Sequence, residues 1–405
     1  MSAGGSMAKI VFCWECGVSL GHIGPSRPIL AELCKRGHNV SAVLRNLSDV
    51  DTVFRGLDIQ FLQAPLAKEA VHTTPGAPTF SRQLITCGLG KPSDSAVMFQ
   101  SWRTLFRFLK PDFALLDYSP LAMLALRGSG ARIAQIGTGF CCPPAVSPFP
   151  CFVPCAPELL PTAFEDDQKV LATMNAHLVV SGQESLKSVA ELFAGTDETF
   201  LVTYPELDHY QNRGPANYWG TWADDEEAAV PNWPSASDRR AFVYLHWFDT
   251  LPAVLELLNY WQISTIVYSN SIPDHIKAKF VTPYMRFETC RQSLPRIAEE
   301  CHFAVTHGNH FTTAYLLGRG VPLLMFPLHT EMEMTARRIA ELGAGRCVYP
   351  HQPEQIAPQL GSLLLNNTAK RVATELSKRW ASIEAERSPV RIADRIEELI
   401  QRGPS

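Results

Sequence analysis

The chain has 405 residues, of which 46% are hydrophobic and 19% charged, and its formal net charge is -4 at pH 7. This length leaves room for two or three domains with a sizeable core. No basic excess points to a nucleic-acid partner, and no apolar run approaches the roughly 20 residues of a spanning helix. We therefore expect a globular protein that has no transmembrane segment and binds no nucleic acid.

The N-terminus and the cysteines bear on the cellular compartment. We interpret Met1–Ser6 as vector-derived residues before a native Met7, and no secretory signal follows them. The 11 cysteines are therefore expected to be free thiols in a reducing cytoplasm. A redox or zinc role for the CxxC pair Cys13 and Cys16 is the less favoured alternative, because no second pair completes a metal set. Four further cysteines match no zinc spacing and are interpreted as buried or loop thiols: Cys141, Cys142, Cys151 and Cys155.

The chain opens with a predicted strand, loop, helix and second strand. Ala8–Cys13 is a short apolar run, Pro28–Arg36 has amphipathic spacing with Gly37 after it, and Asn39–Leu44 is apolar again. This order is a βαβ unit. The loop over residues 15–26 does not contain the GxGxxG pattern, and Arg45 and Asn46 rather than an acidic residue stand at the tip of the second strand. A dinucleotide site of the Rossmann type is therefore not expected.

Alternation of helix and strand continues along the first half. We predict a helix over Val97–Leu109 and strands over Phe113–Leu116, Ala131–Ile136 and Phe200–Thr203. These elements belong to a first domain of residues 7–210.

The composition changes after this domain. Residues 211–240 are polar, contain Pro and Gly and carry an acidic run, so they are predicted to be an interdomain linker. Strands at Phe242–Leu245 and Ile263–Tyr268 begin a second domain of residues 241–385. Residues 369–402 are predicted to be helical, with a break near Pro389.

The most informative stretch of the second domain runs from His307 to Gly345. A strand over Phe303–Thr306 leads through a polar turn into a helix, which is followed by a second strand over Val321–Phe326 and a second helix over Glu333–Leu342. In parallel α/β layers, ligands lie at the carboxyl ends of strands, where a helix N-terminus stabilises an anion. A histidine there, followed by glycine and threonine, suits a diphosphate.

This stretch resembles the donor-binding motif of family 1 glycosyltransferases, which have the GT-B fold. The resemblance is carried by His307-Gly308, Thr312, Gly320-Val321-Pro322, Glu331 and Ala336-Arg337. It implies an α/β protein with two Rossmann-like, doubly wound parallel-sheet domains facing a cleft. It also implies that a C-terminal helix, residues 386–405, packs back on the first domain. The co-substrate would be a UDP- or dTDP-linked sugar, with no cofactor and no metal.

The resemblance also assigns donor-site roles. The diphosphate would be bound by His307, Gly308, Asn309, Thr312 and Thr250, the sugar by Glu331 and Met332, and the nucleoside by Phe287, Gln292 and Tyr315.

Four of these positions depart from the family pattern. Thr250 is the only obvious hydroxyl after the first strand of the second domain, and Phe287 replaces a tryptophan expected at position 289. Tyr315 stands where a glutamate holds the ribose, and Met332 where a glutamine grips sugar hydroxyls. The last change favours a 6-deoxy sugar, unless Met332 points into the core.

The opening loop supplies the predicted catalytic base. Gly21-His22-Ile23-Gly24 resembles the start of the same family, in which a loop histidine deprotonates the acceptor. A neutral imidazole titrates near working pH, which suits this task. Asp117, after the strand at residues 113–116, matches the family's partner acid. The alternatives are that His22 only packs against the protein and that Asp117 caps the helix beginning near Leu121.

Together these features predict an inverting, metal-independent glycosyltransferase that acts on a hydroxyl of a small, partly apolar acceptor. Transfer to a lipid or macromolecule, a non-catalytic nucleotide-sugar-binding relative and a nucleotide-sugar epimerase are the alternatives. We expect a cytoplasmic protein, with a homodimer as one possible assembly.

Overall fold

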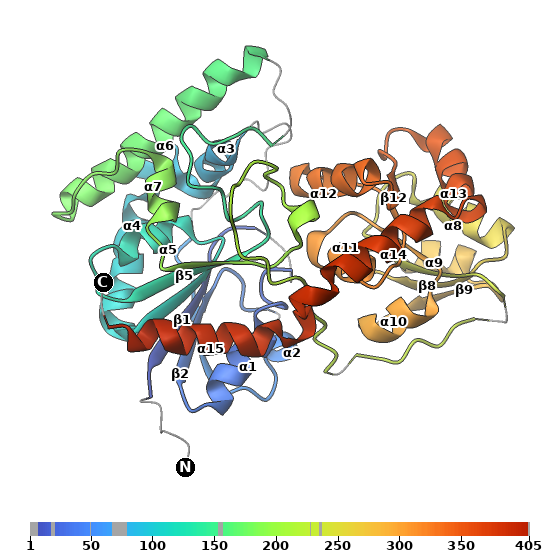
Figure 1. The fold of residues 1–405 in the computed structure, drawn as a ribbon, viewed down its shortest axis with the longest axis horizontal. Coiled ribbons are helices and arrows are strands. Elements are labelled where there is room, and N and C mark those ends of the chain that lie inside the picture. The colour runs from blue at the N-terminus through green and yellow to red at the C-terminus, as the bar shows by residue number, and fades with distance from the viewer. Residues whose placement is uncertain are drawn as a thin grey trace. The chain divides into compact units, whose positions relative to one another are not determined.

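The computed structural model describes residues 7–17, 21–48, 50–66, 79–152, 157–226, 228–234 and 237–403. The predicted vector-derived residues and Cys155 lie outside these ranges. The chain forms two compact units, the first made of residues 1–202, 208–219 and 387–405, and the second of residues 203–207 and 220–386. Each unit is built around one six-stranded sheet (Figure 1).

The first unit contains a wholly parallel sheet with the strand order β3-β2-β1-β4-β5-β6. Its strands are β1 (Lys9–Trp14), β2 (Asn39–Leu44), β3 (Ile59–Gln63), β4 (Phe113–Asp117), β5 (Arg132–Gly137) and β6 (Glu198–Leu201). Its helices are α1 (Arg27–Lys35), α2 (Val50–Val53), α3 (Phe80–Leu84), α4 (Pro92–Leu109), α5 (Pro120–Leu126), α6 (Leu160–Val180), α7 (Val189–Ala194) and α15 (Ser388–Gln401).

The second unit contains a parallel sheet with the order β12-β11-β10-β7-β8-β9. Its strands are β7 (Arg240–Tyr244), β8 (Ser264–Tyr268), β9 (Met285–Glu288), β10 (Phe303–Thr306), β11 (Leu323–Met325) and β12 (Gly345–Cys347). Its helices are α8 (Leu251–Tyr260), α9 (Asp274–Phe280), α10 (Leu294–Glu300), α11 (His310–Leu317), α12 (Thr330–Glu341), α13 (Ile356–Leu365) and α14 (Thr368–Trp380).

Continuous apolar runs explain why these sheets are parallel and covered on both faces. Every residue of β4 and of α5 is buried, as is every residue of β10. Strands of this kind have no polar face to expose, so helices must cover both sides of the sheet. The predicted fold class of two doubly wound parallel sheets is confirmed.

The two C-terminal helices differ from the single broken helix that was predicted. α14 ends at Trp380, and α15 begins at Ser388. Between them, Glu384 adopts a left-handed backbone with φ of 52°. Pro389 lies in the first turn of α15, where a helix needs no N–H from it, so the break comes before the proline.

Helix α15 belongs to the first unit, although it ends the chain. Arg36, just after α1, forms ion pairs with Asp394 at 2.8 Å and with Glu397 at 2.7 Å. The Glu397 carboxylate also contacts Nε2 of His38 at 3.0 Å.

The segment predicted to be a linker is divided, because residues 211–219 belong to the first unit and residues 220–240 to the second.

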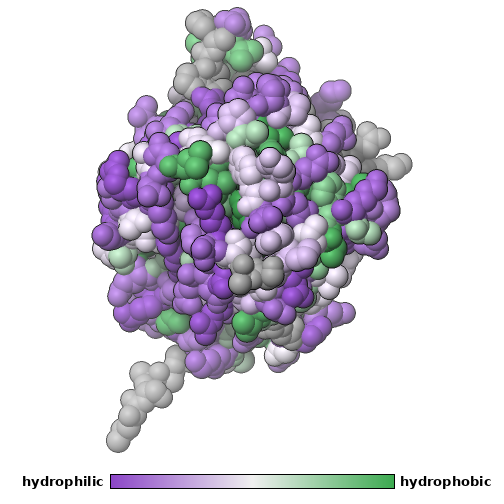
Figure 2. Space-filling model, turned by 90° about the vertical axis from the view of Figure 1, so that its right-hand side faces the viewer, coloured by the Kyte–Doolittle hydropathy of each residue, from purple (hydrophilic) through white to green (hydrophobic). Residues whose placement is uncertain are grey.

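The surface in Figure 2 is largely hydrophilic, and its hydrophobic residues form separate small patches. Within the described ranges, no helix combines the length and the apolar character needed to cross a bilayer.

A buried carboxyl group joins β1 to α5. Oε2 of Glu15 accepts hydrogen bonds from the backbone N–H groups of Leu121 at 3.0 Å and Ala122 at 3.2 Å. Glu15 is only 3% exposed, and this burial raises the pKa of its carboxyl to about 8, although the two hydrogen bonds oppose the shift.

This pKa predicts a pH-dependent effect of Glu15→Gln. Between pH 4.5 and 8 the folded state holds a proton on Glu15 that the unfolded state loses, so the wild-type free energy of unfolding falls as pH rises through this window. An amide cannot ionise and still accepts the two N–H groups. Above pH 8, Glu15→Gln should therefore exceed wild type in free energy of unfolding by roughly 2–5 kcal/mol, and the difference should shrink toward pH 5.

Urea unfolding at several pH values between 5 and 9 measures this difference. Glu165→Gln, which changes an exposed side chain of α6, is the control and should show a flat difference. A flat difference for Glu15→Gln as well would contradict the prediction.

Candidate functional site

His22 and Asp117 meet at the carboxyl edge of the first sheet. Nδ1 of His22 lies 2.8 Å from Oδ1 of Asp117, and both side chains are mostly buried, at 14% and 9% exposed. Asp117 ends β4, and β4 pairs with β1 so that Asp117 stands beside Trp14. Because the loop containing His22 follows β1, the parallel pairing of these two strands brings the histidine and the acid together.

Aromatic rings and a glycine fix the His22 imidazole. The ring of Trp14 stacks on it at a centroid distance of 5.7 Å, and Tyr118 lies 6.0 Å away. Tyr118 has an unusual positive φ of 43°, a strained backbone of the kind found at functional sites. Gly17 lies so close that an added Cβ would stand 2.2 Å from His22 Nε2.

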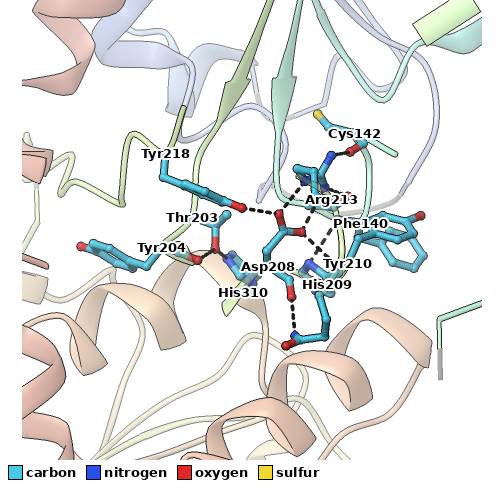
Figure 3. Close-up of polar contacts among 12 residues, drawn as sticks. Phe140, Cys142, Thr203, Tyr204, Asp208, His209, Tyr210, Arg213, Tyr218 and His310 are labelled. Atoms are coloured by element: carbon cyan, nitrogen blue, oxygen red, sulfur yellow. Dashed lines mark hydrogen bonds and ion pairs between the residues drawn. The ribbon is translucent and has the colours of Figure 1, made fainter. Parts of the chain in front are cut away.

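The loop after β5 is held against the same edge. Arg213 donates to the carbonyl oxygens of Cys142 at 2.6 Å and Gly139 at 3.3 Å (Figure 3). Asp208 in turn accepts from Arg213 Nε at 2.5 Å and from the Tyr218 hydroxyl at 2.9 Å. The Arg213 guanidinium keeps the pKa of Asp208 below its usual value despite burial. This buried ion pair thus fixes the loop backbone.

In the second unit, His307 is bound through both ring nitrogens. Nδ1 donates to the carbonyl of Phe326 at 2.6 Å, and Nε2 accepts from the N–H of His246 at 2.7 Å. The residue is 1% exposed, and burial lowers its pKa to about 4, so the ring is neutral near pH 7. Neither nitrogen is left to donate to a phosphate, which differs from the role predicted for this side chain. His307 instead ties together the ends of β7, β10 and β11.

The turn after β10 leads into the N-terminus of α11. The Gly308 N–H donates to Oγ1 of Thr306 at 3.1 Å, and Thr306 also bonds to Thr313 at 3.0 Å. Asn309 is the residue before the helix, and Thr312 lies partly exposed in its first turn. The first N–H groups of a helix point out of its N-terminus and favour an anion. A diphosphate-binding role for Gly308, Asn309 and Thr312 stays a prediction, and these residues lie at or just before the N-terminus of α11.

His310 anchors the first turn of α11. Its Nε2 lies 2.8 Å from Oγ1 of Thr203 and its Nδ1 lies 3.2 Å from Oγ1 of Thr335 (Figure 3). Because Thr335 belongs to α12, this buried histidine connects α11 to the helix that carries the predicted sugar-binding residues.

Glu331 and Met332 lie in the first turn of α12, and both are partly exposed. A Cβ on Gly308 would stand 2.7 Å from the Met332 carbonyl oxygen, and Gly308 has a φ of 82°. Only glycine fits this backbone and this close approach. The packing brings the predicted sugar-binding turn against the predicted diphosphate-binding turn.

The remaining predicted donor residues have other contacts. The Thr250 hydroxyl donates to the carbonyl of Pro350 at 3.0 Å, so its proton is not available to a phosphate. Tyr315 is 1% exposed and its hydroxyl donates to Glu386 at 3.2 Å. These contacts differ from the predicted binding roles of the two residues.

Phe287 and Gln292 are also held by the protein itself. Phe287 packs against the core of the second unit. Gln292 is 3% exposed, and its amide donates to the Cys290 carbonyl at 3.0 Å. The sequence placed Phe287 and Gln292 in a nucleoside site from their positions along the chain. Whether such side chains are accessible to a ligand depends on the helices that pack over them, which local sequence does not show.

The cysteines correct one expectation. Cys13 and Cys16 are free and buried, and burial raises the pKa of both thiols well above the usual value. Cys141 and Cys142 are likewise buried, and neither forms a disulfide. Cys151 is disulfide-bonded, so the prediction of a free thiol is wrong there. Sequence spacing did not reveal this, because a disulfide depends on where the loop places its sulfur atoms.

Two histidines near the turn after β10 were not predicted. His246 follows β7 and is exposed, and its ring stacks on His307 at a centroid distance of 5.7 Å. His329 precedes α12 and lies near enough to His307 to lower its pKa further. The sequence could have indicated both residues, because His246 comes directly after a predicted strand and His329 lies directly before a helix. Burial lowers the pKa of His246, so its ring would meet an anion as a neutral N–H donor near pH 7.

A groove of about 760 Å³ lies at the carboxyl end of β3 in the first unit. Its wall is formed by residues after β3 and by one face of α4: Gln63, Ala64, Pro65, Ala96, Val97, Gln100, Ser101, Thr104 and Leu105. Most of these side chains are small or apolar.

The chain was compared with known proteins, and no family model matches it. A curated relative, the NDP-glycosyltransferase YjiC of Bacillus subtilis (strain 168), is 39% identical over 59 residues. That match covers only 14% of this chain and 15% of the relative's length.

Solved structures resemble the chain over nearly its whole length. The calicheamicin glycosyltransferase CalG4 gives a TM-score of 0.73 at 16% identity, covering 98% of this chain and 99% of that one. The glycosyltransferase VinC in complex with dTDP gives 0.69 at 16% identity, covering 97% of this chain and 100% of that one. At this level of identity the likeness concerns the fold, and the chain therefore has the GT-B fold.

The contacts of His307 predict a loss of stability in His307→Ala. Removing the ring leaves the buried Phe326 carbonyl and the His246 N–H without their partner and opens a cavity. The free energy of unfolding should fall by roughly 2–4 kcal/mol, as measured by urea unfolding. His275→Ala, at an exposed position of α9, is the control. Equal stability of the two variants would contradict the structural role of His307.

Proposed function

We propose that the protein is an inverting, metal-independent glycosyltransferase that moves a sugar from a UDP- or dTDP-linked donor to a hydroxyl group of a small, partly apolar acceptor. The observation that carries this proposal is the 2.8 Å contact between His22 Nδ1 and Asp117 Oδ1. Support comes also from the GT-B fold and from the local match to a protein named an NDP-glycosyltransferase.

The proposed base works through the two nitrogens of one ring. Asp117 accepts the Nδ1 proton of His22, which orients the imidazole and stabilises the imidazolium that forms. Nε2 takes the proton of the acceptor hydroxyl while its oxygen attacks the anomeric carbon. The bond from this carbon to the diphosphate breaks, and the nucleoside diphosphate leaves with the electron pair. Attack from the opposite side inverts the anomeric centre.

Donor binding is proposed at the carboxyl edge of the second sheet. The first N–H groups of α11 and the Thr312 hydroxyl would bind the diphosphate, and the helix N-terminus would supply the positive field that a metal provides elsewhere. His246 would add a further donor, and His307 would hold the strand ends in position. Glu331 would bind sugar hydroxyls from the first turn of α12, with Met332 against the sugar.

The groove beside β3 is our proposed acceptor site. It opens at the same sheet edge as His22, and its wall is partly apolar. β3 lies two strands from β1, a spacing of about 10 Å that one small acceptor can span.

Loss of the base should be visible in donor hydrolysis as well as in transfer. His22→Ala should lower kcat by roughly 10²–10⁴, because the attacking hydroxyl is no longer deprotonated. Asp117→Asn should lower it less, since the imidazole remains. Release of the nucleoside diphosphate measures both variants, and unchanged thermal midpoints would show that they are folded.

His275→Ala, which changes an exposed histidine of α9 that has no role in the proposed mechanism, is the matched control and should keep wild-type turnover. Full turnover in His22→Ala would rule out the proposed mechanism. Wild type that binds dTDP or UDP but turns over no donor would favour the non-catalytic alternative.

Diphosphate binding should depend on Thr312. Thr312→Ala removes one hydrogen bond to a charged group, so its affinity for dTDP and UDP should weaken by about 1.5–3 kcal/mol in calorimetry. Its stability should stay close to that of wild type, unlike that of His307→Ala. Thr374→Ala on α14, whose hydroxyl donates to the Lys370 carbonyl of the same helix, is the control. Affinity that is unchanged in Thr312→Ala, or lost on adding a chelator, would contradict this site.

A further inference from the structure

A thiol lies beside the histidine and the carboxylate of the proposed base. His22, Asp117 and Cys141 each offer one ligand atom, and these three atoms all lie within 4.8 Å of one another. In a tetrahedral zinc centre, bond lengths of about 2.0–2.3 Å place ligand atoms roughly 3.3–3.6 Å apart. Side-chain shifts of about 1 Å would therefore close the three atoms around an ion.

The fold places the Cys141 thiol rather than leaving it on an open loop. Cys141 is 5% exposed, and its Cβ would lie 3.4 Å from a Cβ built on Gly137, at the end of β5. On the two sides of Cys141, the Phe140 N–H donates to His209 Nδ1 at 3.1 Å and the Cys142 carbonyl accepts from Arg213 at 2.6 Å (Figure 3). Ligands held in this way by hydrogen bonds around them bind metal with little reorganisation.

The mixed donor set selects the kind of ion. One imidazole nitrogen, one carboxylate oxygen and one thiolate sulfur suit Zn²⁺, whereas Mg²⁺ and Ca²⁺ prefer oxygen ligands alone. Three protein ligands with a fourth position for water are the pattern of an open zinc site.

We propose that His22, Asp117 and Cys141 form an inhibitory binding site for Zn²⁺. On binding, the Cys141 S–H bond breaks, an S–Zn bond forms and the proton passes to water. The ion occupies the imidazole and the carboxylate that proton transfer requires, so the acceptor hydroxyl keeps its proton. The inhibition rests on the proposed function of His22 as the base, whereas the binding of the ion does not.

Cobalt provides a readout that is independent of activity. Full-length protein, first stripped with a chelator, is titrated with Co²⁺, whose thiolate complexes show a charge-transfer band in the near ultraviolet. Wild type should show this band and Cys141→Ser should lack it. Cys142→Ser, which changes the neighbouring buried thiol, and Cys290→Ser, which removes an exposed thiol, should both retain it. Competition of Zn²⁺ with Co²⁺ should give an affinity that falls more than about 100-fold in Cys141→Ser.

The second measurement is donor turnover with increasing Zn²⁺, each variant being compared with its own rate without metal. The inhibition constant should equal the dissociation constant from the cobalt competition and should rise with it in Cys141→Ser. A band that is absent from wild type, kept in Cys141→Ser or lost in Cys142→Ser would overturn the metal site. Cys141→Ala serves as the second variant should the serine variant be unfolded.

The two proposals fail in different ways. A Cys141-dependent cobalt band without inhibition by Zn²⁺ would overturn the inhibitory role and leave the metal site standing. Full turnover in His22→Ala, together with the same band in wild type, would overturn the proposed base but not the metal site.

Discussion

Parallel pairing of strands is the constraint on which both candidate sites depend. All strands of each sheet run in the same direction, so the loops that follow them gather at one edge. In the first unit this brings the loop after β1, the end of β4 and the loop after β5 together. In the second unit it brings together the segments that follow β7, β10 and β11. Residues far apart in the chain become neighbours because parallel pairing places the carboxyl end of every strand at the same edge of the sheet.

The two central histidines show how burial separates chemical roles. His307 is buried, bonded to two backbone groups and kept neutral, so it serves to order three strand ends. His22 is bonded to a carboxylate and retains some exposure. A ring with one nitrogen held by an acid can exchange a proton at the other, whereas a ring bound to backbone at both nitrogens can only position its neighbours. The same residue type at equivalent sheet edges therefore has a structural role in the second unit, while in the first unit its contact with a carboxylate is the arrangement that our proposed base requires.

Two sets of buried polar side chains, the Arg213–Asp208 ion pair and His310, hold loops and helix ends in position. Arg213 and Asp208 fix the loop after β5 from a segment more than 60 residues further along the chain, as the sequence numbers of Arg213 and Cys142 show. His310 does the same between α11 and α12. Such groups are costly to leave unpaired in a low-dielectric interior, so a completed network holds its loop in one arrangement. Cys141 gains its fixed place beside Asp117 from this network rather than from its own side chain.

The sequence by itself determined the fold class and the central elements of both sheets, whereas α6 and the edge strands β3 and β12 were not predicted. Uninterrupted apolar runs such as those of β4 and β10 cannot be exposed on either face, and the alternation with helices then leaves a covered parallel sheet as the solution. The ends of strands also pointed to His22, Asp117 and the turn after β10. What only the tertiary structure decided was the partner of each side chain: that both nitrogens of His307 and the hydroxyls of Thr250 and Tyr315 are already bonded, and that Cys141 reaches His22 and Asp117. Local pattern records whether a residue is polar and where its element ends, but hydrogen bonds and burial are set by groups that long-range folding brings from elsewhere in the chain.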